Sequence, residues 1–194
     1  VEVIFSPLLH MDKITHQPLD MAAEHLRVDS FPWRLTARLN EDDLRRTDMI
    51  QQILAFIGTI QGVELHKDKL FMIASELYNN ALEHGVLKLS SALKNSVGGF
   101  EEYYRERAER LANLHAGHID VDFTFVRGEP NEVHMVVSNS GEGFNFRQYL
   151  PSENDALDSS TGNHGRGIQL LRQLCKSFDF DHGGCTAKAV YQFQ

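Results

Sequence analysis

Three polar side chains recur at intervals of four in the stretch ASELYNNALEHG, residues 74–85, namely Glu76, Asn80 and His84. Steps of four residues on an α-helix rotate by only about 40° each, so these side chains share one face with Glu83. The apolar side chains of the same helix fall on the opposite side: Leu70, Ala74, Leu77, Tyr78 and Ala81. The polar face therefore predicts either a solvated surface or the rim of a site that combines a carboxylate, an amide and an imidazole.

Two glycine-containing stretches later in the chain could contribute to such a site. The strand-like run VHMVVSN ends at Asn139 and is followed by Gly141 and Gly143. Because the two glycines lack side chains, a flat ligand or another backbone segment can approach closely there. Gly165 and Gly167 lie at the start of a helical run in GNHGRGIQLL, where backbone N–H groups can hold phosphate. The spacing matches neither the P-loop nor the dinucleotide fingerprint, which excludes both of those folds.

The elements that position these residues follow from the apolar periodicity, since alternation predicts strands and repeats of three or four predict helices. Asn40, followed by acidic residues, predicts a helix N-cap, and Gly85 predicts a left-handed helix end. The predicted strands are 31–39, 118–125, 132–139 and 185–193, and the predicted helices are 41–60, 66–85, 100–114 and 165–178. This pattern predicts an α/β fold of the α+β type, a two-layer sandwich in which helices pack on one face of a mixed sheet.

Length and composition favour one domain, because a chain of 194 residues with 42% apolar content can bury its own core. Residues 1–29 lack sustained periodicity and are interpreted as a connector or the remnant of an upstream region, so that the domain spans 30–194. A first residue of Val rather than Met is expected of a fragment of a longer protein, although N-terminal processing gives the same start.

Charge and cysteine usage exclude several classes of function. The formal net charge is −8 and no block of Lys and Arg is present, which excludes nucleic acid as a direct ligand. No secretory signal is recognisable and no apolar run approaches the ~20 residues that a membrane span needs, so a soluble, cytoplasmic protein is predicted. Cys175 and Cys185 form no CxxC pair and are interpreted as reduced, buried thiols rather than metal ligands.

Three motifs together resemble the nucleotide-binding boxes of a known superfamily. They are E-x-x-x-N-x-x-x-H-G at 76–85, N-S-G-E-G-F at 139–144 and H-G-R-G-I-Q-L-L at 164–171. They look like the N, G1 and G2 boxes of GHKL-type (HATPase) ATP-binding domains, which include gyrase, histidine kinases and bacterial anti-sigma-factor serine kinases. The chain has no length for a gyrase-like transducer domain and shows no convincing phosphoacceptor His, so the serine-kinase branch fits best. The resemblance covers about 30–194 and implies the Bergerat-type fold, as in domains fused C-terminal to a response regulator and a phosphatase.

The resemblance implies roles for residues of the first motif and the last strand. Glu76 would be the general base that accepts the proton of a serine hydroxyl on a partner protein. Asn80 would be a ligand of Mg²⁺, and His84 would lie near the phosphates of ATP. Thr186, on the final strand, would lie beneath the adenine. ATP and Mg²⁺ are therefore the implied cofactors.

The glycine-containing motifs receive nucleotide-binding roles in the same way. Asn139, Gly141 and Gly143 would bind on the adenine side. The start of the following helix would contribute backbone N–H groups and a cation at the phosphates, through Gly165, Arg166, Gly167 and Ile168. The polar loop 147–164 would be the ATP lid.

The chain departs from the family pattern in two places. Asn139 stands where the family normally has Asp, so an adenine amino group would lose a charge-assisted hydrogen bond worth about 1 kcal/mol or somewhat more. Asn139→Asp is accordingly expected to tighten binding of Mg-ATP. The segment from 86 to about 117 is longer than the family pattern and is interpreted as either a partner-binding or a homodimer-forming addition.

Two functions of different classes follow from these observations. The first is an ATP-dependent serine kinase that phosphorylates an anti-sigma-factor antagonist, and intact Glu76 and Asn80 favour it. The second is a non-catalytic or weakly nucleotide-binding module that sequesters a sigma factor or its antagonist, and Asn139 favours that one. A structural domain whose motifs coincide by chance is a third interpretation.

Overall fold

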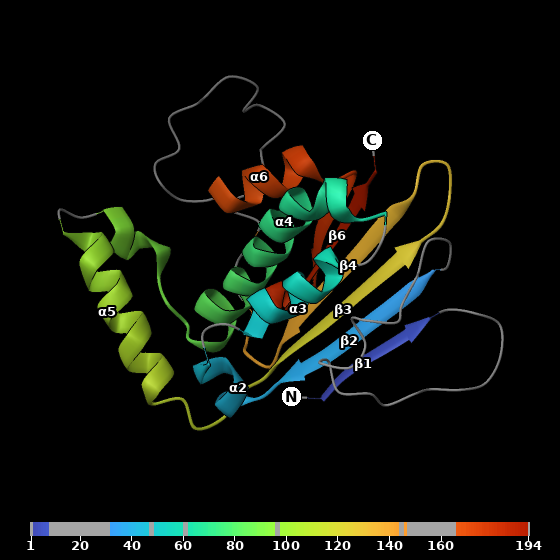
Figure 1. Cartoon of the computed structure of the whole chain (residues 1–194). Coiled ribbons are helices and arrows are strands. Elements are labelled where there is room, and N and C mark those ends of the chain that lie inside the picture. Colours follow the sequence, from blue (N-terminus) through green and yellow to red (C-terminus); the bar gives the residue numbers. More distant parts are fainter. Residues whose placement is uncertain are drawn as a thin grey trace, which may run out of the picture.

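The computed structural model describes residues 2–7, 32–46, 49–59, 62–95, 98–143, 146 and 166–193. Its centre is one six-stranded sheet in the order β1-β2-β3-β4-β6-β5 (Figure 1). The strands are β1 (Glu2–Pro7), β2 (Trp33–Leu39), β3 (Ile119–Val126), β4 (Glu132–Asn139), β5 (Ser177–Asp181) and β6 (Thr186–Gln192). All five pairings between these strands are antiparallel, so the mixed sheet expected from the sequence is corrected to an antiparallel one. Short connections such as the turn between β3 and β4 return the chain beside itself in the opposite direction.

The helices form the second layer. They are α2 (Glu41–Arg45), α3 (Met49–Gly58), α4 (Lys67–Asn79), α5 (Gly99–Ala112) and α6 (Arg166–Leu174). Figure 1 shows α3, α4 and α6 over one face of the sheet, with α5 standing beside them. The two-layer α+β sandwich with helices on one face, predicted from the sequence, is therefore confirmed. Within the described residues, no helix combines the length and the apolar character needed to cross a membrane.

Alternation along the strands directs one row of side chains into the core. On β2 every second residue from Trp33 to Leu39 is buried, while Arg34 and Arg38 are exposed. Leu35 pairs with Phe123 on β3, which pairs with Met135 on β4. The helices cover this row with fully buried residues of α3 and α4, among them Ile53, Ile73, Ala74 and Leu77. Each such large side chain contributes roughly 1.5–3 kcal/mol through burial, which is what holds the two layers together.

The predicted N-cap at Asn40 is confirmed. Its Oδ1 accepts hydrogen bonds from the N–H groups of Asp42 and Asp43 at 3.1 and 3.2 Å, and the Asp43 carboxylate accepts one from the Asn40 N–H at 3.1 Å. This reciprocal arrangement satisfies donors that a helix start leaves unpaired. The helix that begins there, α2, is short and ends at Arg45.

The single helix predicted for 41–60 is wrong, since the structure has two helices, α2 and α3. Arg46, between them, has an extended backbone with ψ of 103°. Leu44 and Ile53 are both fully buried, yet nine residues of a straight helix would place them about 180° apart. A break between them allows both side chains to reach the same core.

The helix that carries the first motif continues beyond α4 as a π-helical segment, Asn80–Val86. Its wider hydrogen bonding is seen where the Leu87 N–H donates to the carbonyl of Leu82, five residues earlier, at 2.8 Å. Gly85 is not the left-handed terminator that the sequence predicts, because it keeps a negative φ, and the left-handed residue is Lys88, with φ of 53°. Close packing explains this glycine instead: a Cβ atom at Gly85 would lie 2.4 Å from Cγ of Asn139.

Two further differences concern strands. The connector predicted for 1–29 is wrong over Glu2–Pro7, which form the edge strand β1, while residues 8–29 lie outside the described part of the chain. Phe5 anchors β1, because its ring lies 5.9 Å from that of Trp33 and 5.4 Å from that of Phe56. The helix predicted for 165–178 ends at Leu174, and β5 follows, because the alternation in SFDFD buries Phe180. The predicted lid 147–164 and Gly165 also lie outside the described residues.

The packing of His66 predicts a dependence of stability on pH. Its ring stacks on Phe193 with centroids 4.1 Å apart, and its Nδ1 lies 2.8 Å from the Tyr191 hydroxyl. Burial, with a smaller effect of Lys69, lowers the pKa of His66 below its ordinary value. The unfolded chain therefore takes up a proton more readily, and stability falls as the pH decreases from about 6.5 towards the lowered pKa.

The measurement is denaturant unfolding at pH 7 and pH 5 of the wild type, His66→Gln and His115→Gln. We expect His66→Gln to reduce the loss of stability between the two pH values. His115, which is exposed, serves as the control and should leave that loss unchanged. Equal pH dependence of the wild type and His66→Gln would contradict the prediction.

Candidate functional site

The structure brings the first motif and the third motif into contact. Glu76 on α4 faces the first turn of α6, where Gly167 lies. A Cβ atom at Gly167 would lie 2.1 Å from Oε2 of Glu76 and 3.0 Å from its Cδ. The carboxylate therefore occupies the space that any side chain at this position would need. The glycine therefore leaves room for a neighbouring carboxylate, which is an arrangement that two separate sequence motifs cannot reveal.

The surroundings of Glu76 favour its protonated form. Burial raises the pKa of this carboxyl above its ordinary value, and the negative charge of Glu83 raises it further, while Lys94 acts in the opposite direction. A carboxylate with a raised pKa is a better proton acceptor at neutral pH than an exposed one. The polar face predicted from the sequence thus includes a carboxyl group suited to general base catalysis.

Asn80 lies one turn after Glu76, and its amide is available for a ligand. Its Nδ2 is buried and has no hydrogen-bond partner among the described residues. The oxygen and nitrogen of an amide are alike in shape, so a rotation of 180° would place the oxygen at the same point. An unpaired buried amide costs free energy, and an amide oxygen is a suitable ligand for Mg²⁺, so Asn80 fits the metal that the motifs imply.

Among the described residues, Asn80 has no cage of protein ligands for a metal. Within the described residues, no group of three or more His, Cys, Asp or Glu side chains is arranged to hold an ion. Mg²⁺ commonly binds one or two protein ligands together with water and the phosphates of a nucleotide. The donor set around Asn80 is therefore compatible with a metal that arrives with a nucleotide.

His84 is oriented by the backbone that follows the π-helical segment. Its Nδ1 lies 2.8 Å from the carbonyl oxygen of Leu89, which can only accept a hydrogen bond. Nδ1 therefore carries a proton, and in the neutral ring Nε2 does not. His84 would donate from Nε2 to a phosphate only as the imidazolium ion.

The second motif is tied to the end of the helix by Asn139. Its Nδ2 donates to the carbonyl of Cys185 at 3.0 Å, and its Oδ1 accepts from the N–H of Gly141 at 3.0 Å. Because one partner only accepts and the other only donates, the orientation of the amide is fixed. The amide also fills the space beside Gly85. Asn139 is thus a structural link between β4, the turn after it and the start of β6.

The glycines of this turn permit contacts between backbone segments. A Cβ atom at Gly141 would lie 2.2 Å from the carbonyl oxygen of Gly85, and one at Gly143 would lie 2.2 Å from that of Gly183. The free, half-buried Cys185 donates from Sγ to the carbonyl of Gly141 at 3.2 Å. Of the two interpretations of Gly141 and Gly143, close approach of backbone is therefore the one that the described contacts support.

Three further predicted residues, Thr186, Arg166 and Ile168, do not gather around Glu76. Thr186 bonds Ser138 through their hydroxyl groups at 3.0 Å, and strand alternation places it on the sheet face opposite Ala187. Since Ala187 belongs to the core under the helices, Thr186 does not join Glu76 on the helix side. Arg166 is exposed at the first residue of α6, whereas the side chain of Ile168 is buried in the core.

Sequence reasoning overlooked the partners of Glu83. This carboxylate accepts a short hydrogen bond from the Tyr103 hydroxyl and another from Nε of Arg107 at 3.0 Å. Nζ of Lys94 lies 3.7 Å from it and 3.9 Å from the centre of the Tyr103 ring. The only signal in the sequence was that Glu83 shares the face of Glu76. Tyr103 and Arg107 lie on the helix predicted for 100–114, but nothing in the sequence related that helix to Glu83.

The geometry of Asn139 reverses the effect expected for Asn139→Asp. A carboxylate cannot donate to the Cys185 carbonyl, and two oxygens would then face each other. We expect the free energy of unfolding at neutral pH to fall by about 1–3 kcal/mol, the usual cost of a broken buried hydrogen bond. Binding of Mg-ATP should weaken rather than tighten.

Chemical denaturation of the variant and of a matched control, Asn113→Asp, measures this. Nδ2 of Asn113 also donates to a backbone carbonyl, that of Glu109 at 3.0 Å, but in an exposed position. The control should change stability by less than about 0.5 kcal/mol. A stability of Asn139→Asp equal to that of the wild type would contradict the role assigned to the amide.

Comparison with known proteins assigns no family: no family model and no curated protein matches this chain. The functional assignment therefore depends on three short motifs and on the contacts among them. Two of those contacts are close, Glu76 with Gly167 and Gly85 with Asn139. A buried amide, a half-buried carboxyl and the start of a helix consequently form one candidate site.

Proposed function

We propose that this chain is an ATP-dependent protein serine kinase of the GHKL type, in which Glu76 is the general base. The observation that supports it best is the packing of the Glu76 carboxylate on Gly167, at the start of α6. This contact joins a proton acceptor to a helix start, the feature that binds phosphate in many proteins. The resemblance of the motifs adds the class of partner, an anti-sigma-factor antagonist with a serine hydroxyl.

Each residue of the site has a task in this proposal. Glu76 would accept the proton of the serine hydroxyl as that oxygen attacks, and burial raises the pKa of the carboxyl, which makes it a better proton acceptor. Asn80 would hold the metal through its amide oxygen. The N–H groups in the first turn of α6 would bind phosphate, with Arg166 beside them. Bound Mg-ATP would supply the phosphoryl group and the positive charge that offsets its developing negative charge.

A second function is supported by a different observation. The Asn139 amide is engaged by Cys185 and Gly141, and it carries no charge with which to bind an adenine amino group. A module that binds a sigma factor or its antagonist without efficient catalysis would tolerate this. We place it second, because such a module has no need for a carboxylate in a position that raises its pKa.

Glu76→Gln tests the kinase. The amide keeps the shape of the side chain but accepts no proton, so transfer of labelled γ-phosphate to a co-purified antagonist protein should fall by about 10²-fold or more. Affinity for Mg-ATP, measured by calorimetry, should be unchanged. Because the pKa of Glu76 is raised by folding, its ionised form destabilises the fold at neutral pH. The variant should therefore be more stable than the wild type at pH 7, and the gain should disappear below about pH 4.3.

Asn80→Ala is the matched comparison on the same face of the helix. It removes the proposed metal ligand, so it should lower affinity for Mg-ATP as well as the rate of transfer. A wild-type protein that binds the partner but transfers no phosphate, with Glu76→Gln indistinguishable from it, would favour the binding module. A wild-type protein that shows no heat of binding with Mg-ATP would exclude the kinase.

Gly167→Ala tests the contact between the two motifs. The added methyl group would displace the Glu76 carboxylate, which can move because it is the end of a flexible side chain. The free energy of unfolding should change little, because the higher helix propensity of Ala, worth up to about 1 kcal/mol over Gly, offsets the cost of moving the carboxylate. The transfer rate should nevertheless fall by about 10²-fold, because a displacement of about 1 Å can cost that much.

The control is Gln169→Ala on the exposed side of the same helix, which should leave the transfer rate unchanged. Both variants are compared with the wild type by thermal unfolding and by the transfer assay. A Gly167→Ala protein with the full transfer rate would show that the position of the carboxylate is unimportant, and would count against Glu76 as the base.

A further inference from the structure

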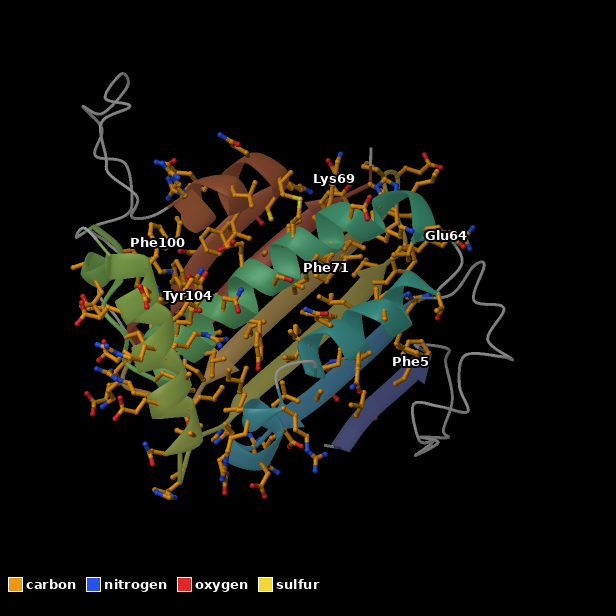
Figure 2. The ribbon with its side chains drawn as sticks, turned by 60° about the vertical axis from the view of Figure 1, so that its left-hand side comes forward. Phe5, Glu64, Lys69, Phe71, Phe100 and Tyr104 are labelled. Carbon is orange, nitrogen blue, oxygen red and sulfur yellow. The ribbon has the colours of Figure 1, made fainter. Side chains whose placement is uncertain are left out.

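Helix α5 contacts the π-helical segment Asn80–Val86 at Glu83 and the chain just after it at Leu87 and Lys88. Figure 1 shows α5 beside the end of the helix that carries the first motif. One side of α5 is turned towards the molecule, where Tyr103 is fully buried, while Phe100 and Tyr104 are exposed (Figure 2). Tyr103, Arg107 and Arg110 share one face of this helix, because they are spaced four and three residues apart.

The first contact is centred on Glu83, within the π-helical segment. Its side chain is only 13% exposed and is bound by Tyr103 and Arg107 from α5. Lys94, from the 3₁₀ turn Ser91–Asn95, completes the group of charges. A carboxylate so far removed from water requires these donors, since an unpaired buried charge is strongly unfavourable.

The second contact lies just after the segment. Nη1 of Arg110 donates to the carbonyl oxygens of Leu87 and Lys88, at 2.7 Å in each case. Carbonyl groups at the end of a helix lack intrahelical partners, and a cation there also interacts favourably with the helix dipole. Glu106, one turn earlier on α5, forms an ion pair with the same guanidinium group and holds it in place.

A π-helical turn needs such support more than an α-helical turn does. Segments with i→i+5 hydrogen bonds are rare, occur mostly as single turns and are frequent at functional sites. This one carries Asn80 at its first residue and His84 near its end. The N–H of Asn80 still bonds the carbonyl of Glu76 in the α-helical manner, so Asn80 keeps its place one turn after Glu76. If the rest of the segment reverted to α-helical geometry, the residues after Asn80, His84 among them, would change their direction relative to Glu76.

We infer that α5 braces this π-helical segment through Glu83 and Arg110 and thereby positions His84, near its end, relative to Glu76 and Asn80. The identity of the ligand that they would meet rests on the proposed function. Arg110, Arg107 and Tyr103 are thus positioning residues, since they act through the segment. In this inference the long addition after the first motif has an intramolecular task, and its use as a partner or dimer surface stays a prediction.

Hydrogen exchange of the ligand-free protein tests the brace directly. Arg110→Met keeps the apolar stem and removes the donors, so amides of residues 80–89 should exchange at least about tenfold faster. Exchange in β4 should be unchanged, because global destabilisation would affect that core strand as well. Arg105→Met is the matched control on the same helix, where the guanidinium is exposed and lies 3.9 Å from Glu102 alone among the described acidic groups. Arg110→Lys should restore part of the protection.

Mg-ATP binding provides the functional readout. The Kd for Mg-ATP should rise about tenfold in Arg110→Met, should stay unchanged in Arg105→Met, and should partly recover in Arg110→Lys. Unchanged protection of residues 80–89, or equal effects of the two Met variants, would overturn the inference. The exchange measurement decides this even if the wild type binds no nucleotide, an outcome that would overturn only the proposed function.

Arg107→Met gives a second, independent variant, should Arg110→Met fail to fold. It removes one donor to Glu83 and leaves the Tyr103 hydroxyl in place. We expect the same local loss of protection at residues 80–89, by a smaller factor. Equal protection in this folded variant and in the wild type would likewise contradict the brace.

Discussion

The candidate site depends on one close contact, in which the end of the motif helix touches the end of β4. Gly85 has no side chain, so the amide of Asn139 can lie against its backbone. The same amide bonds the Cys185 carbonyl and the Gly141 N–H, which joins the sheet to the turn that follows it. Because both partners are backbone groups with fixed roles, the contact leaves little freedom. This junction fixes where the end of the motif helix meets the sheet, and the buried residues of α4 hold the rest of the helix on the sheet.

The polar face of the motif helix destabilises the fold, because it places polar groups where they are partly buried. Along the same helix, Leu70, Ile73 and Leu77 bury fully against the sheet and stabilise the two layers. Glu76 and Asn80 instead leave a carboxyl with a raised pKa and an amide nitrogen that has no hydrogen-bond partner in the described part of the chain. A sequence selected for stability alone would replace both groups, so their presence together favours a function at this rim.

Charge is balanced differently one turn further along. Glu83 is largely buried, and its negative charge is compensated by two basic side chains and a tyrosine hydroxyl. Its negative charge also acts on Glu76. The addition after the first motif is therefore connected to the candidate base by electrostatics as well as by packing, although it lies outside the motifs.

The sequence by itself determined the layers and the faces. Apolar alternation predicted the strands from Trp33 to Leu39 and from Glu132 to Asn139, and the acidic turn after Asn40 predicted an N-cap, because these are local effects of side-chain direction and backbone hydrogen bonding. The polar and apolar sides of the motif helix were predictable for the same reason. Only the tertiary structure decided the break after α2, the edge strand β1 and the π-helical end of the motif helix. Each of these depends on a segment that is distant in the sequence. The break after α2 depends on the core that Leu44 and Ile53 share, β1 depends on the rings that pack on Phe5, and the π-helical end depends on the hydrogen-bond donors of α5. The same holds for the glycines, since the atoms that exclude a side chain at Gly85 and Gly167 belong to Asn139 and Glu76, which are remote in sequence.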